Sequence, residues 1–311
     1  MTPTSLARPR ALRPGDRVAV LAPSSPVEPD ALAAGLDALR FAGLEPVTYP
    51  SAHDPGTMRR YLAGDDAMRA GDLRSALTDA GIAGILFARG GSGAQRTLEA
   101  MDWDGLNPEA GLPPKVLAGF SDITAILEAV AVRLGWASVF GPNVAIKEGA
   151  SHYSFGSLLR TLMRPEHATT IEYPQAKTIV AGTARGLTTG GTLSLLVSSL
   201  GTCTSRPARG GILLLEDVNE EDYRIDRMLT QLRRSGYLDG VAAIVAGTFT
   251  GCGPPEAIQD ILAERLGPLG VPMLAWANVG HGGQFQAFPL GIAAELDADA
   301  ATLRLLDPPL S

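Results

Sequence analysis

The sequence is poor in cysteine, in basic residues and in long apolar runs, and each shortage excludes a class of protein. Two cysteines among 311 residues are too few for a disulfide scaffold or a four-thiolate zinc site. The 33 acidic residues outnumber the 26 basic ones, and the net charge of −7 argues against a duplex nucleic-acid binder. The apolar run at 18–22 is shorter than the roughly 7–15 residues of a secretory signal or the about 20 of a membrane helix. We therefore expect a cytoplasmic protein with no nucleic-acid or membrane partner.

The rest of the composition is that of a folded protein large enough for two domains. Hydrophobic residues make up 45% of the chain and charged residues 19%, which is typical of globular rather than disordered proteins. A length of 311 residues exceeds the roughly 100–200 residues of a single domain. The 36 glycines and 23 prolines predict many turns and close backbone approaches.

Up to about residue 145, short apolar segments alternate with amphipathic ones. This pattern is typical of a parallel sheet whose faces are covered by helices. The expected strands are 17–22, 45–49, 84–88 and 115–118. The pattern then weakens, and short strands return only from about residue 190 onward.

The organisation predicted from this pattern is an α/β fold in two parts. We expect an N-terminal Rossmann-like parallel-sheet domain over residues 1–150, a crossing over 151–185, and a smaller, β-rich C-terminal α/β domain over 186–311. An apolar face at helical spacing predicts a helix near 222–235. The ending 292–306 predicts two strands joined by a turn.

Ser121 is the first candidate functional residue. It stands in Gly119-Phe-Ser-Asp-Ile-Thr124, between a predicted strand and a helical stretch, which would expose it at the carboxyl edge of the sheet. A serine at such a turn can act as a nucleophile, with the next backbone N–H facing an oxyanion. Serine is also a favoured helix N-cap, and Ile123 replaces the glycine that usually follows such a nucleophile. Both interpretations stay open from this segment alone.

A serine nucleophile needs a base, and the chain has four histidines. His53, His152 and His167 lie in polar, turn-like sequence and are expected at the surface. His281 lies in Asn278-Val-Gly-His-Gly-Gly-Gln284, where glycines allow a sharp turn and leave room for a substrate. Histidine is the usual general base near neutral pH, although a lone loop histidine is more often structural.

The imidazole would need a carboxylate to orient it, and Glu216 is the candidate. It follows the apolar strand 211–215, where a carboxylate without a partner would be costly to bury. Other acids crowd the same loop, among them Asp217 and Asp222, and could stay hydrated while capping the helix that follows. Helix capping explains Glu216 poorly. The order along the chain would be serine, glutamate, histidine.

The loop Ala88-Arg-Gly-Gly-Ser-Gly93 follows another predicted strand. It matches neither G-x-G-x-x-G nor the Walker pattern with its lysine, so we predict no nucleotide-phosphate site. Its adjacent glycines allow a backbone N–H to point into a cleft, which could complete an oxyanion hole with the amide of Asp122. No cluster of histidine, cysteine and carboxylate residues has the spacing of a zinc site, and we expect neither a metal nor a cofactor.

Five segments along the chain form a recognisable set: Arg89-Gly-Gly, Gly119-Phe-Ser-Asp, Gly190-Gly-Thr-Leu-Ser-Leu-Leu, Leu215-Glu-Asp with Tyr223-Arg-Ile-Asp-Arg227, and Gly280-His-Gly. Together they resemble the LD-carboxypeptidases of the S66 serine-peptidase family, which also contains the microcin C immunity peptidases. The resemblance covers nearly the whole chain. Each motif is modest alone, but five in order are specific.

The resemblance implies a role for each candidate residue. Ser121 would be the nucleophile, Glu216 the orienting acid and His281 the base. The backbone N–H groups of Gly91 and Asp122 would hold the oxyanion, with Gly90 as the alternative to Gly91. The family's two-domain fold and usual homodimer are implied in the same way. The implied substrate is a muropeptide-like peptide, cleaved between an L-centre of meso-diaminopimelate or lysine and a terminal D-alanine.

Two other functions stay open. A hydrolase of the microcin-immunity type would cleave acyl-sulfamoyl or phosphoramidate nucleotides and would need an aromatic platform for a base, for which Trp103, Trp136 and Trp276 are available. A non-catalytic ligand-binding module is the second alternative. For a substrate carboxylate, Arg89 and Arg224 are the candidate cations by position, and either could instead pair with an acidic residue.

Overall fold

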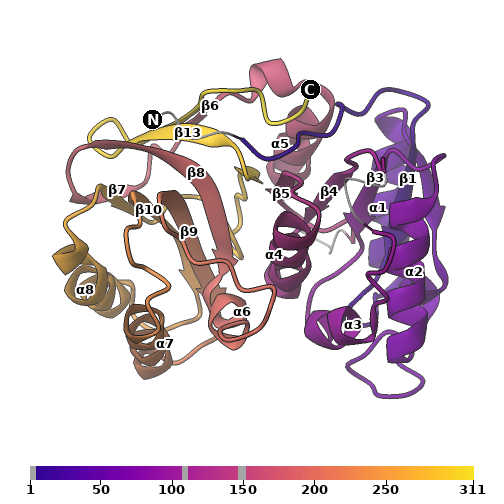
Figure 1. Ribbon diagram of the computed structural model, residues 1–311, viewed down its shortest axis with the longest axis horizontal. Helices are drawn as coiled ribbons and strands as arrows, with labels where there is room; N and C mark the ends of the chain where they lie inside the picture. The colour runs from indigo at the N-terminus through magenta and orange to yellow at the C-terminus, as the bar shows by residue number, and fades with distance from the viewer. Residues whose placement is uncertain (1–4, 107–110, 146–151) are drawn as a thin grey trace.

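The computed structural model, which describes residues 5–106, 111–145 and 152–311, contains two sheets (Figure 1). In the first, strands β1 to β5 are parallel, and β12 returns from the far end of the chain to pair antiparallel with β5. The strand order is β12-β5-β4-β3-β1-β2. The strands are β1 (Arg17–Leu21), β2 (Glu45–Thr48), β3 (Gly84–Phe87), β4 (Val116–Gly119), β5 (Ser138–Phe140) and β12 (Phe288–Leu290).

Helices cover both faces of this first sheet because its strands are apolar on both sides. Helices α2 and α4 pack on one face, and α1 and α5 pack on the other. The helices of this half are α1 (Pro29–Phe41), α2 (Asp66–Thr78), α3 (Ala94–Ala100), α4 (Thr124–Arg133) and α5 (His152–Met163). Since the chain crosses from β2 past β1 to β3, β1 and β3 form the switch point of the sheet. The loops that follow these strands and β4 meet at one edge, where open α/β sheets bind ligands.

The second sheet has parallel strands β8 to β11 at its centre and antiparallel strands at both sides. Helices α6, α7 and α8 cover one face of it (Figure 1). The strands are β6 (Thr170–Glu172), β7 (Lys177–Val180), β8 (Thr183–Thr192), β9 (Gly211–Val218), β10 (Ala243–Thr250), β11 (Met273–Ala275), β13 (Ala293–Asp297) and β14 (Thr302–Leu305). The helices are α6 (Leu193–Ser198), α7 (Asp222–Arg234) and α8 (Pro255–Leu266).

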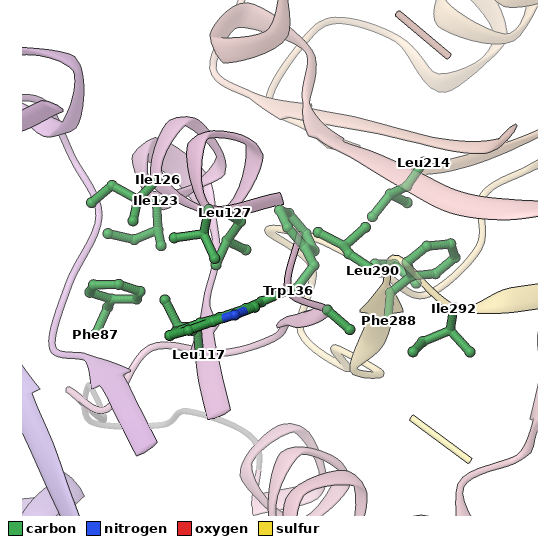
Figure 2. Close-up of a cluster of buried hydrophobic side chains, with 14 of the residues drawn as sticks. Phe87, Leu117, Ile123, Ile126, Leu127, Trp136, Leu214, Phe288, Leu290 and Ile292 are labelled. Carbon is green, nitrogen blue, oxygen red and sulfur yellow. The ribbon is translucent and has the colours of Figure 1, made fainter. Parts of the chain in front are cut away.

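The other face of the second sheet packs against the first half of the chain. One apolar cluster contains Trp136 and Leu117 from the first half, Leu214 from β9, and Phe288 and Leu290 from β12 (Figure 2). All five side chains are buried. A shared core of this kind fixes the two sheets relative to each other, so residues from both can form one site.

The α/β fold class predicted from the sequence is confirmed. The helix predicted near 222–235 is α7, which buries Ile225, Leu229 and Leu232, and the predicted closing strands are β13 and β14. The predicted crossing over 151–185 contributes α5 to the first core and β6 and β7 to the second sheet, which has more strands than the first. No helix in the described parts of the chain is long and apolar enough to cross a membrane.

Candidate active site

Ser121 occupies a strained turn between β4 and α4. Its φ angle is +66°, a left-handed conformation that costs a non-glycine residue roughly 1–3 kcal/mol. It begins a short 3₁₀ turn, Ser121–Ile123, and the N-cap position of α4 is occupied by Ile123, not by Ser121. The N-cap interpretation of Ser121 is therefore wrong. A strained serine at the carboxyl edge of a parallel sheet is the geometry of a nucleophile elbow.

Two glycines leave room for this turn. A Cβ atom at Gly90 would lie 2.8 Å from Ser121 Cβ, and one at Gly119 would lie 3.0 Å from both Ile123 and Asn143. The backbone N–H of Phe120, just before the serine, donates to Asn143 Oδ1 at 3.3 Å. The loop after β3 thus lies directly against the serine, as the motif containing Gly90 predicts.

Glu216 and His281 form a buried hydrogen-bonded pair. Glu216 Oε2 accepts from His281 Nδ1 at 2.7 Å and from the His281 backbone N–H at 3.1 Å. The other oxygen, Oε1, accepts from Thr192 Oγ1 at 2.5 Å. The Glu216 side chain is fully buried and that of His281 is 17% exposed. The carboxylate is thus compensated by three donors, and its bond to Nδ1 leaves Nε2 of the imidazole for chemistry.

A glycine turn makes the glutamate–histidine pair possible. Gly280 has φ = +111°, and a Cβ atom there would collide with Glu216 Oε2. The adjacent His281 can therefore bring both its backbone N–H and its ring to one carboxylate oxygen. This is the sharp turn that the flanking glycines predict.

The serine and the histidine are brought together through Phe120. The ring of Phe120, the residue before Ser121, lies 4.7 Å from the His281 ring between centroids and 4.9 Å from the ring of Phe285. No hydrogen bond joins Ser121 Oγ to His281 in the described chain, and the link between them is the ring of Phe120. Such bonds are often long without substrate and tighten when substrate binds.

Three backbone N–H groups beside Ser121 are free to bind an anion. Those of Gly90, Gly91 and Asp122 donate no hydrogen bond within the described residues. Gly91 has φ = +108°, and the next amide along the loop, that of Ser92, donates to a serine hydroxyl instead. Both glycines of the loop therefore remain candidates for the first donor of an oxyanion hole, with Asp122 as the second.

The Asp122 side chain has a role that the sequence did not reveal. Its carboxylate is buried, and Oδ2 accepts from Ser24 Oγ at 2.7 Å and from the Ala94 backbone N–H at 2.8 Å. Burial raises the pKa of this carboxyl above its usual value, and the two hydrogen bonds oppose that shift. Asp122 therefore ties the turn at Ser121 to the loop after β1 and to the start of α3. The only hint of this role in the sequence is Ser24, a possible hydrogen-bond donor shortly after β1.

The sequence suggests that Asp217 lies in a loop whose acids could stay hydrated. In the structure it lies in β9 and is buried. Its carboxylate accepts from the Ser194 backbone N–H at 2.8 Å and from the Val218 backbone N–H at 2.9 Å. Burial raises the pKa of Asp217 to about 6, and the neighbouring Glu216 contributes in the same direction. Asp217 therefore caps α6 and does not face the solvent.

The two candidate cations differ in their partners. Arg89 donates to the carbonyl of Pro26 at 2.6 Å and pairs with no carboxylate in the described chain. Arg224 lies 3.4 Å from the carboxylate of Glu220 and 3.3 Å from the hydroxyl of Tyr223. Of the two, Arg89 is the one whose positive charge is not already matched by an acid, and it adjoins Gly90 beside the serine.

In the described parts of the chain, no tryptophan and no other histidine has a hydrogen bond or ring contact with Ser121, Glu216 or His281. His53 and His167 are exposed, as expected, and the side chain of His152 lies outside the described residues. Trp136 is buried in the core (Figure 2), and Trp103 is partly buried and packs against the same apolar cluster. Trp276 is partly buried, and its indole N–H donates to a glutamine. In the described ranges, no group of three or more histidine, cysteine or acidic residues could hold a metal ion.

Comparison with known proteins finds matches along almost the whole chain. Residues 18–141 match the LD-carboxypeptidase N-terminal domain, and residues 185–296 match the LD-carboxypeptidase C-terminal domain. A protein of Streptomyces coelicolor assigned as a carboxypeptidase is 48% identical over 98% of both chains. The murein tetrapeptide carboxypeptidase of Pseudomonas aeruginosa is 32% identical over 91% of this chain and 94% of its own.

Solved structures share the fold. The muramoyltetrapeptide carboxypeptidase of Oxalobacter formigenes has a TM-score of 0.77 at 25% identity, covering 93% of this chain and 97% of its own. The protein MccF, solved in complex with glutamyl sulfamoyl guanosine, has a TM-score of 0.86 at 20% identity, covering 99% of this chain and 100% of its own. At that identity the second likeness concerns the fold alone.

Proposed function

The chain belongs to the LD-carboxypeptidase family, and on that premise we propose that it is a serine carboxypeptidase acting on murein tetrapeptides. It would hydrolyse the amide between an L-centre of meso-diaminopimelate or lysine and a terminal D-alanine. The observation that carries the proposal is the buried Glu216–His281 pair, which lies against the turn that holds Ser121 in a left-handed conformation.

In this proposal, Ser121 attacks the amide carbonyl while His281 accepts the hydroxyl proton at Nε2. Glu216 keeps Nδ1 protonated and stabilises the imidazolium that forms. The amides of Asp122 and of Gly91 or Gly90 bind the oxyanion of the tetrahedral intermediate. The imidazolium then gives its proton to the nitrogen of D-alanine, and the C–N bond breaks.

The second half of the reaction reuses the same groups. An acyl-enzyme remains on Ser121 after D-alanine leaves. A water molecule then gives a proton to His281 Nε2 and attacks the ester carbonyl. Collapse of the second tetrahedral intermediate returns the proton to Ser121 Oγ and releases the shortened peptide. Every proton passes through one imidazole, so its orientation by Glu216 affects both halves.

Two observations favour a peptide with a free carboxyl end as substrate. The relatives from Pseudomonas aeruginosa and Oxalobacter formigenes carry tetrapeptide carboxypeptidase names and match the chain over most of its length. Arg89, beside the nucleophile turn, offers a guanidinium with no acidic partner in the described chain. We propose that it binds the terminal carboxylate of the substrate.

The acyl-nucleotide alternative has less support in the site. Its substrate would need an aromatic surface for stacking a base, and Trp136 is buried in the core, while Trp103 and Trp276 pack against apolar clusters. The non-catalytic alternative leaves a fully buried, correctly paired glutamate and a strained serine without a purpose, because strain of this kind persists where function needs it.

The proposal is tested by incubating the protein with a tetrapeptide that ends in D-alanine and measuring the loss of one alanine by mass spectrometry. We expect release by the wild type and no detectable release by Ser121→Ala. Ser235→Ala, at the end of α7, is the matched control and should react at the wild-type rate. A peptide amidated at its carboxyl end should react far more slowly, since it lacks the anion that Arg89 would bind.

Three outcomes separate the alternatives. Equal release by the wild type and Ser121→Ala would contradict the serine mechanism. Hydrolysis of an acyl-sulfamoyl nucleotide, tested in parallel, without release of alanine from the tetrapeptide would favour the microcin-immunity activity. No reaction with either substrate would favour the ligand-binding module.

Location and assembly belong to the same proposal. We propose a cytoplasmic homodimer, as the family resemblance implies. Light scattering on the purified protein measures the assembly directly, and a mass equal to one chain would contradict it. Fractionation of cells that produce the protein tests its location.

A further inference from the structure

Strand β8 ends directly beside the buried carboxylate of Glu216. In the parallel register of β8 and β9, Thr192 is the partner of Glu216. Gly190 and Gly191 precede it with φ angles of +104° and +150°, and a Cβ atom at Gly191 would lie 2.7 Å from Thr124. Glycines are therefore required for the close approach that places Thr192 at the carboxylate.

Thr192 is bonded to both sides of the site at once. Its hydroxyl donates to Glu216 Oε1 at 2.5 Å, while its backbone N–H donates to Thr124 Oγ1 at 3.1 Å. Thr124 is the first residue of α4, three residues after Ser121. The result is a hydrogen-bonded chain from the nucleophile helix through Thr192 and Glu216 to His281, and Thr192 is 2% exposed.

From this chain we propose that Thr192 is a positioning residue of the catalytic site. Its hydroxyl holds Glu216 in the rotamer that orients His281. The inference rests on the proposed function, because it gives Thr192 a role through the same glutamate–histidine pair.

The donor on Oε1 matters because the carboxylate has no other way to satisfy that oxygen. Both bonds from His281 reach Oε2, and within the described chain Thr192 Oγ1 is the single donor to Oε1. A fully buried carboxylate oxygen that loses its donor is costly. Without Thr192, the Glu216 side chain would rotate to find another donor, and this change would weaken its hold on the imidazole.

The test compares Thr192→Val, which keeps the shape of the side chain without the hydroxyl, with Thr192→Ser, which keeps the hydroxyl. We expect Thr192→Val to lower kcat about 10- to 100-fold with KM little changed. We also expect its pH–rate profile to differ from that of the wild type, because the carboxylate that orients His281 has lost a donor. Thr192→Ser should keep most of the activity and the wild-type profile.

Thr188→Val is the matched control. Thr188 lies four residues earlier on β8, is also buried, and bonds to the backbone of Ile292 through its hydroxyl. This change should lower the melting temperature without moving the pH profile. If Thr192→Val merely resembles Thr188→Val, with lower stability and an unchanged profile, Thr192 has a structural role only and the inference is wrong.

A second readout needs no substrate, so it separates this inference from the proposed function. The Nδ1 proton of His281, donated to a carboxylate, should give a downfield proton NMR resonance that Glu216→Gln removes. We expect Thr192→Val to shift this resonance, and Thr192→Ser and Thr188→Val to keep it in place. An unchanged resonance in Thr192→Val would overturn the inference even if the wild type hydrolyses the tetrapeptide. A shifted resonance would support it even if that peptide is not the substrate.

Discussion

Ser121 and the Glu216–His281 pair come from different halves of the chain and are held in place by different interactions. Ser121 makes no side-chain hydrogen bond in the described chain, and its position depends on backbone strain and on the glycine packed against it. Glu216 and His281 depend on a buried network of hydrogen bonds that includes Thr192. The position of Ser121 is therefore sensitive to backbone conformation and to added side-chain volume. The Glu216–His281 pair is sensitive to the loss of a hydrogen-bond donor or acceptor.

Replacing the serine itself should give the largest effect. Ser121→Ala and Ser121→Gly should both lower kcat by about 10⁴-fold or more, since the nucleophile is lost. If strain holds this turn, they should differ in stability: glycine adopts φ = +66° freely and should exceed alanine by about 1 kcal/mol in the free energy of unfolding. Denaturant titration measures the difference, and equal stability would contradict the account of the nucleophile side.

The next largest effect is expected from adding one methyl group beside the Glu216–His281 pair. Gly280→Ala places a Cβ atom against Glu216 Oε2 and also requires φ = +111°, so we expect kcat to fall about 100-fold and stability to fall by about 2–4 kcal/mol. Gly283→Ala is the control, because no atom lies within 4 Å of the added carbon. If both variants lose activity equally, flexibility of the loop matters and not the fit of the pair.

The smallest expected effect on activity comes from a change at Glu128, where the two halves meet, and its readout is stability. This carboxylate on α4 accepts from the Arg206 backbone N–H at 3.0 Å, and burial raises its pKa to about 7. A raised carboxyl pKa means that ionisation opposes folding, so this group lowers stability as the pH rises from about 4.5 to 7. Glu128→Gln should remove that slope, with a gain over the wild type of up to about 3 kcal/mol at pH 7.5.

Melting curves of the wild type and Glu128→Gln between pH 5 and 8 measure this effect. Asp217, whose pKa is raised to about 6, contributes to both proteins, so the difference between the two curves isolates Glu128. A difference that does not change with pH would show that folding does not raise the Glu128 pKa, and it would contradict this prediction.

Much of the site could be predicted from the sequence because its main residues stand at the ends of strands. Ser121 stands two residues after β4, Glu216 follows the apolar part of β9 within the strand, and His281 stands among glycines, so local sequence was enough to nominate each. The strain at Ser121 could not be predicted, because serine is also a common helix cap. The structure shows this strain through the positive φ angle of Ser121.

The residues that support the site could not be predicted for a different reason. Thr192 and Glu216 are 24 positions apart and meet only through the register of β8 and β9. Asp122 and Ser24 are 98 positions apart. Periodicity reports local burial and contains no information on such pairings. Strands β6 and β7 were missed because they are short, lie at the sides of the second sheet, and expose most of their residues.

The central claim is that Ser121 is made nucleophilic by the Glu216–His281 pair, and covalent labelling tests it most directly. A fluorophosphonate that reacts with activated serines should add one adduct per chain, located on Ser121 by peptide mass spectrometry. Ser121→Ala should remove the adduct, and Glu216→Gln should slow its formation by about 10²-fold or more. An adduct on another residue, or a rate indifferent to Glu216, would contradict the account.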